Sequence, residues 1–168
     1  NGWINFRMRA MLISFASYHL WLHWKPTSDF LASLFIDFEP GIHYLQSQMQ
    51  SGTTGINSIR IYNPIKQGKD HDPHGLFIRK WVPELLNIPL NYIHTPWLIN
   101  PKLKNYPIPI VDEKIARNEA AKKIYRVRAS DEFIEHSKKI YLKHGSRKKN
   151  LNNKNKIISN RKKQMSLF

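Results

Sequence analysis

Residues 3–23 read WINFRMRAMLISFASYHLWLH, and their large apolar side chains recur every three to five positions. This spacing puts them on one broad face of a helix, because an α-helix completes a turn every 3.6 residues. The face consists of Trp3, Phe6, Met11, Phe15, Tyr18 and Leu22, with Met8, Leu12 and His19 alongside. Pro26 is expected to end this helix, since proline lacks the N–H that a helix interior requires.

The rest of the chain also reads as helices joined by loops. We expect the following elements before the proline-rich connection at 87–111: a helix capped by Thr27 or Ser28 and running to Phe38, a helix over 42–50, a turn-rich loop over 51–55, an extended segment over 58–63, and a helix from Asp72 or His74 to Leu85. Asp112 then caps a helix of strong helix formers, and a last helix over 131–144 ends at Gly145. The sequence therefore predicts an all-α fold.

Charge divides the chain into two parts. The composition is 41% hydrophobic and 12% aromatic, which is typical of a globular protein, and the formal charge is +15. Residues 137–168 hold eleven Lys or Arg and no acid. We expect a helical domain over 1–145 and a basic, flexible, disordered tail over 146–168, which either contacts nucleic acid or merely solubilises the protein. The charge favours a polyanionic partner.

Several classes of site and location are excluded by composition. The chain has no Cys, which removes disulfides, thiolate metal sites and Cys nucleophiles. No apolar run approaches the roughly 18 residues that span a bilayer, so we expect a soluble, cytoplasmic protein without a membrane partner. The P-loop lysine and the GxSxG elbow are missing. The first residue is Asn1 rather than Met, and a helical pattern follows at once. We therefore expect the C-terminal piece of a longer protein.

A metal-like cluster occurs in KDHDPHG, residues 69–75, which contains Asp70, His71, Asp72 and His74. Carboxylate and imidazole ligands can hold Zn²⁺ or Mn²⁺. Ligands packed this closely around a proline rarely converge on one ion, and Asp72 or His74 can instead cap the helix that follows. We predict helix capping and no metal site.

Arg7 and Arg9 lie two positions apart on the first helix, so one of them must lie near its apolar side. A buried guanidinium needs an anion, and the turn after the second helix supplies Asp37 and Glu39, close to His43. An antiparallel helix pair would bring Arg9 to Asp37 and leave Glu39 and His43 facing a cavity. The alternative is a partly exposed ion pair with only a structural role.

Five segments in order resemble the DNA photolyase and cryptochrome family: NGWINFRMRAMLISF, LFIDFEPGIHYLQSQMQSGTTG, IRIYNPIKQGKDHDPHGLFIRKWVPEL, HTPW and PIVDEKIARNEAAKKIY. They match the C-terminal half of the helical FAD-binding domain over residues 1 to about 125. The resemblance implies an all-helical domain that holds bent FAD at the bottom of a cavity open to DNA. In this family, light-excited reduced flavin gives an electron to a pyrimidine dimer and takes it back after the ring splits.

The resemblance also implies roles for residues near the cofactor. Arg9 matches the arginine that pairs with the first acid of the turn, Asp37, which borders flavin and ribose. Glu39 stands where a second acid, usually Asp, accepts hydrogen bonds from the flavin ring. His43 occupies the position that faces flavin N5, and Trp24 aligns with the middle member of an electron-carrying tryptophan chain.

Other matches lie toward DNA. Trp3 in GWxxxR matches an aromatic residue at the lesion cavity, and Arg7 matches a basic residue near the damaged strand. Arg60 in RIYNP matches a residue directed at the DNA backbone, where a guanidinium can bind phosphate.

Besides Glu39, this sequence departs from the family at four positions. His43 replaces the Asn common in photolyases, and a titratable imidazole there would change which flavin redox state is stable. Ser47 stands where the tryptophan nearest the flavin is expected, so the usual electron chain is broken. Phe6 replaces a polar lesion contact, and Ala10 stands where dimer photolyases usually have Met.

The family's antenna domain, FAD phosphate-binding loop and far-side lesion residues would all precede residue 1. We therefore expect this chain alone to hold FAD weakly and to be inactive, and an antenna chromophore to bind through the missing N-terminal domain.

The last five residues resemble a bacterial sliding-clamp-binding peptide through Gln164, Leu167 and Phe168. The alternative is a chance ending.

The function expected from the resemblance is light-dependent repair of UV-damaged DNA by a monomeric FAD flavoprotein, a deoxyribodipyrimidine photolyase, which is a carbon–carbon lyase. One alternative is a cryptochrome-like blue-light photoreceptor that uses the same pocket without repair. Another is a helical DNA-binding module without a chromophore, whose basic arm supplies salt-dependent affinity.

Overall fold

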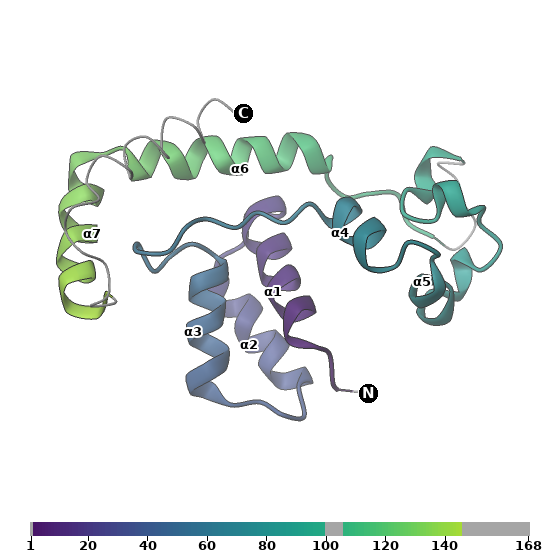
Figure 1. Ribbon diagram of the computed structural model, residues 1–168, viewed down its shortest axis with the longest axis horizontal. Coiled ribbons are helices and arrows are strands. Elements are labelled where there is room, and N and C mark those ends of the chain that lie inside the picture. The colour runs from purple at the N-terminus through teal and green to yellow at the C-terminus, as the bar shows by residue number, and fades with distance from the viewer. Residues whose placement is uncertain (1, 100–105, 146–168) are drawn as a thin grey trace.

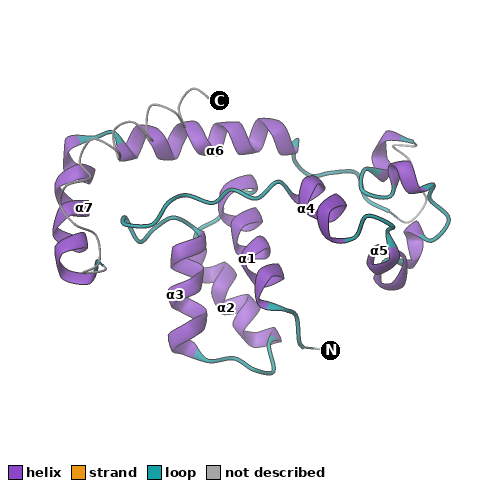
Figure 2. Cartoon of the chain, viewed as in Figure 1, coloured by secondary structure: helices purple, strands orange, loops and turns teal. Residues whose placement is uncertain are grey.

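A computed structural model describes residues 2–99 and 106–145, and in these residues it contains helices and loops but no strand (Figure 2). The predicted all-α class is confirmed. Within the described residues, no helix is both long and apolar enough to span a bilayer. The predicted tail over 146–168, including the clamp-like residues, lies outside the described residues.

The first helix is shorter than expected. α1 spans Phe6–Ser14 and begins where the Asn5 side chain accepts a hydrogen bond from the Met8 amide. A π-helical segment, η1 (Phe15–His19), follows, in which the Leu20 amide reaches back five residues to the Phe15 carbonyl. Trp21 then adopts a left-handed conformation (φ 54°), which ends the helical path. The apolar pattern did not reveal this change of pitch.

α2 (Trp24–Leu34) begins earlier than predicted and corrects the role of Pro26. His23 is the N-cap, and its ring nitrogen accepts a hydrogen bond from the Lys25 amide. Pro26 therefore sits in the first turn, where a helix has unsatisfied N–H groups and tolerates proline. α2 packs against α1 and against α3 (Pro40–Gln50), and the three helices form a cluster (Figure 1).

The extended segment at 58–63 runs across this cluster toward α4 (Figure 1). Fully buried Ser14 fixes it, since its hydroxyl donates to the Arg60 carbonyl at 3.1 Å and accepts from the Tyr62 amide at 3.2 Å. An expected extended loop is thus pinned to α1 by one hydroxyl.

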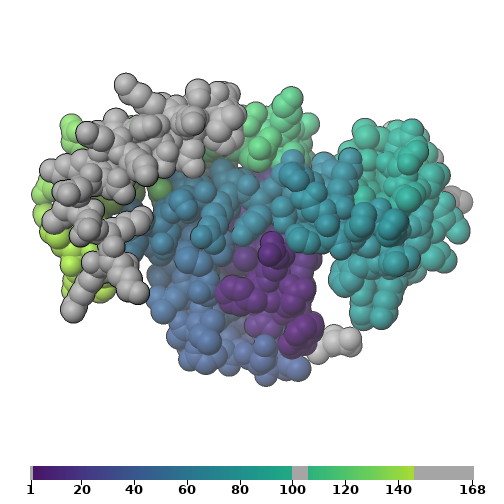
Figure 3. All heavy atoms as spheres, in the orientation of Figure 1, coloured from purple at the N-terminus to yellow at the C-terminus, as the bar shows by residue number. Residues whose placement is uncertain are grey.

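A separate lobe follows and is visible beside the helical cluster in Figure 3. It contains α4 (Pro64–His71), which we did not predict, α5 (Leu76–Trp81) and the short 3₁₀ turns η2 (Pro83–Leu85), η3 (Leu90–Tyr92) and η4 (Pro96–Leu98). Leu85, Ile88 and Ile93 form its small core. The predicted helix to Leu85 ends at Trp81 because Pro83 interrupts it.

α6 (Glu113–Arg128) packs against η1. The buried face of α6 contains Ala120 and Ala121. Its predicted N-cap is confirmed, since the Asp112 carboxylate accepts from the Ile115 amide at 2.8 Å. α7 (Asp131–His144) ends at Gly145, as expected.

Candidate functional site

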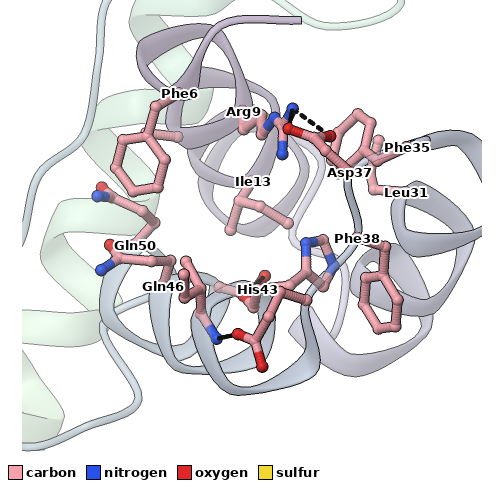
Figure 4. Close-up of a pocket in the computed structure, with 14 residues that line it drawn as sticks. Phe6, Arg9, Ile13, Leu31, Phe35, Asp37, Phe38, His43, Gln46 and Gln50 are labelled. Atoms are coloured by element: carbon pink, nitrogen blue, oxygen red, sulfur yellow. Dashed lines mark hydrogen bonds and ion pairs between the residues drawn. The ribbon is translucent and has the colours of Figure 1, made fainter. Parts of the chain in front are cut away.

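A cavity of about 220 Å³ lies between α1, α2 and α3 (Figure 4). Its apolar lining includes Ile13, Leu31 and Phe35, and charged and polar side chains from α1, α3 and the turn before α3 complete it. Phe6 and Ala10, two of the positions where the sequence departs from its resemblance, also line it.

Arg9 and Asp37 meet at the cavity edge, as the sequence predicted. Arg9 Nη2 lies 2.8 Å from Asp37 Oδ1 and 2.9 Å from Oδ2, while its Nε donates to the Ile4 carbonyl at 2.9 Å. The guanidinium also lies 4.3 Å from the centre of the Phe35 ring. The side chain of Arg9 is 20% exposed and that of Asp37 is 48% exposed, so the pair is an open contact that a ligand can reach.

Glu39 lines the same cavity, but its carboxylate already serves as the N-cap of α3. One oxygen accepts from the Gly41 amide at 3.1 Å and the other accepts from the Ile42 amide. A negative charge there stabilises the positive end of the helix dipole. A carboxylate oxygen has more than one lone pair, so this cap leaves capacity for a further hydrogen bond.

His43 reaches the cavity from the first turn of α3 (Figure 4). Its Nε2 lies 2.8 Å from the carbonyl oxygen of buried Ser28, and the rings of Phe35, Phe38 and Tyr44 surround it edge-on. A carbonyl only accepts, so Nε2 carries the proton. Nδ1 is then the acceptor nitrogen on neutral His43.

α3 also brings three polar residues to the cavity, of which the sequence reasoning missed two. Ser47 is buried, and its hydroxyl donates to the His43 carbonyl at 2.9 Å. Gln46 and Gln50 line the side away from Asp37 and Phe38 (Figure 4). Their side-chain oxygens are buried without a hydrogen-bond partner among the described residues. Their spacing of four on one helix was the available signal.

The other predicted site residues do not line this cavity. Trp3 precedes α1 and is 63% exposed, and Arg7 and Arg60 are exposed elsewhere. Half-buried Trp24 begins α2, where its ring centre lies 5.9 Å from that of His23. The functions expected of these four residues remain predictions.

The KDHDPHG segment supplies a cap. The Asp72 carboxylate accepts from the Phe77 and Ile78 amides at 3.2 and 2.9 Å, at the start of α5. Burial opposes ionisation of Asp72, but these amides outweigh it and lower the pKa of the carboxyl. In the described part of the chain, no three potential ligands gather in one place to bind a metal.

The chain that forms this cavity is similar to proteins of known families. Residues 1–126 match the model of the FAD binding domain of DNA photolyase. A deoxyribodipyrimidine photo-lyase of Alkalihalophilus pseudofirmus is 32% identical over 130 residues, which are 71% of this chain and 27% of that protein. Cryptochrome-2 of Arabidopsis thaliana is 36% identical over 144 residues, covering 79% of this chain and 24% of that protein. The chain thus spans about a quarter of the length of these relatives.

A solved structure agrees with these matches. A bacterial class III photolyase from Agrobacterium tumefaciens superposes with a TM-score of 0.69 at 30% identity, covering 77% of this chain and 29% of that one. The match to the family model covers most of the described helices, including the three that surround the cavity. The chain belongs to the DNA photolyase and cryptochrome family.

Proposed function

We propose that the cavity between α1, α2 and α3 binds the isoalloxazine ring of FAD, and that the chain is part of a light-dependent DNA repair flavoprotein, a deoxyribodipyrimidine photolyase. The observation that carries this proposal is the Arg9–Asp37 pair, which opens onto the same cavity as His43 in a chain of this family.

The residues present suit a flat heterocycle with polar edges. Ile13, Leu31 and Phe35 offer a surface for an aromatic face. His43 Nδ1 offers an acceptor, and the unpartnered amide oxygen of Gln50 indicates that a hydrogen-bonding partner belongs nearby.

Each residue then has a distinct task. Arg9 holds Asp37 at the cavity edge, where its carboxylate accepts from ligand N–H or O–H groups. Glu39 fixes the start of α3, and neutral His43 accepts a hydrogen bond through Nδ1. Bound FAD would supply the photochemical electron for splitting the dimer, and the protein orients and encloses it.

The relatives named photo-lyases support damaged DNA as the partner. Trp3, Arg7 and Arg60 are the proposed DNA contacts, and Trp24 is a proposed electron carrier. Further parts of the proposal are a monomeric cytoplasmic protein, an antenna chromophore bound outside this chain, a domain boundary at residue 145, and clamp binding through the last five residues.

The test uses the protein expressed from its natural reading frame. Purified, reduced and illuminated in the presence of dimer-containing DNA, it should restore undamaged DNA, and the dark control should not. A flavin-containing protein that leaves the DNA unchanged contradicts the repair proposal.

The second candidate is a blue-light photoreceptor without repair activity. It is favoured by Ser47 and His43, which alter the surroundings of the proposed flavin, and by the similarity to cryptochromes. It predicts bound flavin and a light-induced spectral change without repair.

A further inference from the structure

Tyr44 follows His43 on α3 and contacts α2 through Asp29 and Lys25. Its ring centre is 5.3 Å from that of His43 and 6.0 Å from that of Phe38, and both contacts are edge-on. His43 and Phe38 line the cavity, whereas Tyr44 does not. The rings of His43 and Phe38 therefore contact both the phenol and the cavity.

The phenol has a proton acceptor already in place. Tyr44 Oη donates to Asp29 Oδ1 on α2 at 2.8 Å, and Lys25 Nζ lies 2.8 Å from Asp29 Oδ2. The hydrogen bonds from Lys25 and Tyr44 lower the pKa of Asp29, so it stays a carboxylate. Its side chain is 48% exposed, so a proton received there can pass to water.

Lys25 also lies over the Tyr44 ring, with its ammonium 4.7 Å from the ring centre. A cation is attracted to a neutral aromatic ring, but it repels a ring that has lost an electron. Loss of the phenolic proton to Asp29 would leave the oxidised ring neutral and remove this repulsion. The arrangement thus favours departure of the electron and the proton together.

We propose that Tyr44 is a redox-active residue that gives one electron to a light-excited, oxidised flavin in the cavity while its O–H proton moves to Asp29. The inference rests on the proposed function, which supplies the flavin. The O–H bond breaks and a neutral tyrosyl radical remains. The flavin gains one electron, and Asp29 gains one proton and becomes a carboxylic acid.

Three neighbouring residues that line the cavity are poorer electron donors than Tyr44. Ser47 is buried in the cavity wall and has no ring. Phenyl and neutral imidazole rings do not lose electrons readily, so Phe38 and His43 serve as the medium between donor and acceptor. The hydrogen bond from Tyr44 to Asp29 also joins α3 to α2. The competing explanation is therefore that this contact only stabilises the fold.

The experiment separates these explanations with two variants of the natural, FAD-loaded protein. Tyr44→Phe keeps the ring and removes the O–H. Asp29→Asn keeps a hydrogen-bond acceptor but cannot take the proton. Tyr92→Phe, on the exposed η3 turn outside the cavity, is the matched control. Electron paramagnetic resonance during blue illumination detects the radical, and flavin absorbance measures cofactor content.

We expect a tyrosyl radical in the wild type and in Tyr92→Phe, and its loss in both other variants without a loss of bound flavin. An unchanged radical in Tyr44→Phe, or in Asp29→Asn, overturns the inference and leaves the proposed function intact. A structural contact predicts lower thermal stability with the radical unchanged in Asp29→Asn. A protein without bound flavin overturns both the inference and the proposed function.

Discussion

The carbonyl oxygen of Ser28 on α2 lies 2.8 Å from Nε2 of His43 on α3. Since the carbonyl cannot donate, the proton of neutral His43 lies on Nε2, and Nδ1 is the acceptor nitrogen. The packing of α2 against α3 therefore determines which nitrogen of the neutral imidazole accepts a hydrogen bond.

Nitrogen NMR of the 168-residue chain checks this tautomer. We expect Nε2–H on neutral His43, and a shift of Nδ1 when excess FAD is added. His94 is the control, because its Nε2 also lies near a backbone oxygen, that of Asp72 at 3.0 Å, but it does not line the cavity. A proton on Nδ1 of neutral His43 would contradict the assignment.

Replacing Asp37 by Asn should weaken FAD binding more than it weakens folding. Loss of a charge-assisted hydrogen bond to a ligand costs about 1.5–3 kcal/mol, which corresponds to about 10- to 150-fold in Kd. The partly exposed pair with Arg9 contributes no more than about 1 kcal/mol to stability. Fluorescence titration and thermal melting measure the two effects. Asp70→Asn, in the exposed pair with Lys66, should leave FAD binding unchanged, and an equal loss there would sink the prediction.

Acid should loosen the contact between η1 and α6 through His19. Burial lowers the pKa of His19 below its ordinary 6.5, although Glu113 at 3.7 Å partly offsets this. The unfolded chain therefore binds this proton more readily, so the stabilisation is complete above about pH 6.5 and is lost as the pH falls below it. His19→Phe should remove this part of the pH dependence in urea unfolding. Identical pH profiles would contradict it.

Asp72 should contribute more to the stability of the fold than Asp70 does. Asp72→Ala leaves the amides of Phe77 and Ile78 without their acceptor, which costs about 1–2 kcal/mol. For a chain of this size we expect a fall of about 2–4 °C in Tm per kcal/mol. Asp70→Ala, which removes only an exposed ion pair, should change stability by less than about 0.5 kcal/mol. Equal losses would refute a capping role.

Local signals predicted much of the fold. Asp112 was identified as a cap because a short carboxylate before helix formers satisfies free amides, and Gly145 was identified as a stop for the same local reasons. The π-helical turn at Phe15–His19 was missed because an apolar face barely changes when one residue is inserted. The cap at His23 was missed because histidine is an uncommon N-cap.

The sequence predicted the part of the site in which a buried positive charge requires a negative partner. Arg9 needed an anion, and Asp37 was the nearest one across a helix pair. The spacing of Gln46 and Gln50 places them on one face of a helix, but their burial could not be predicted, because it depends on the rotation of α3 against α1. Neither could the Tyr44–Asp29 bond, which requires the registry of α2 against α3.

Methyl NMR of the isoleucine-labelled chain during FAD titration tests the central claim most directly. Ile13 and Ile42 line the cavity, while Ile88 and Ile93 lie in the core of the other lobe. A flavin ring between α1 and α3 should shift the first two methyl signals strongly through its ring current and leave the other two in place. Unmoved Ile13 and Ile42 signals at saturating FAD, or equal shifts in both groups, would contradict a flavin site in this cavity.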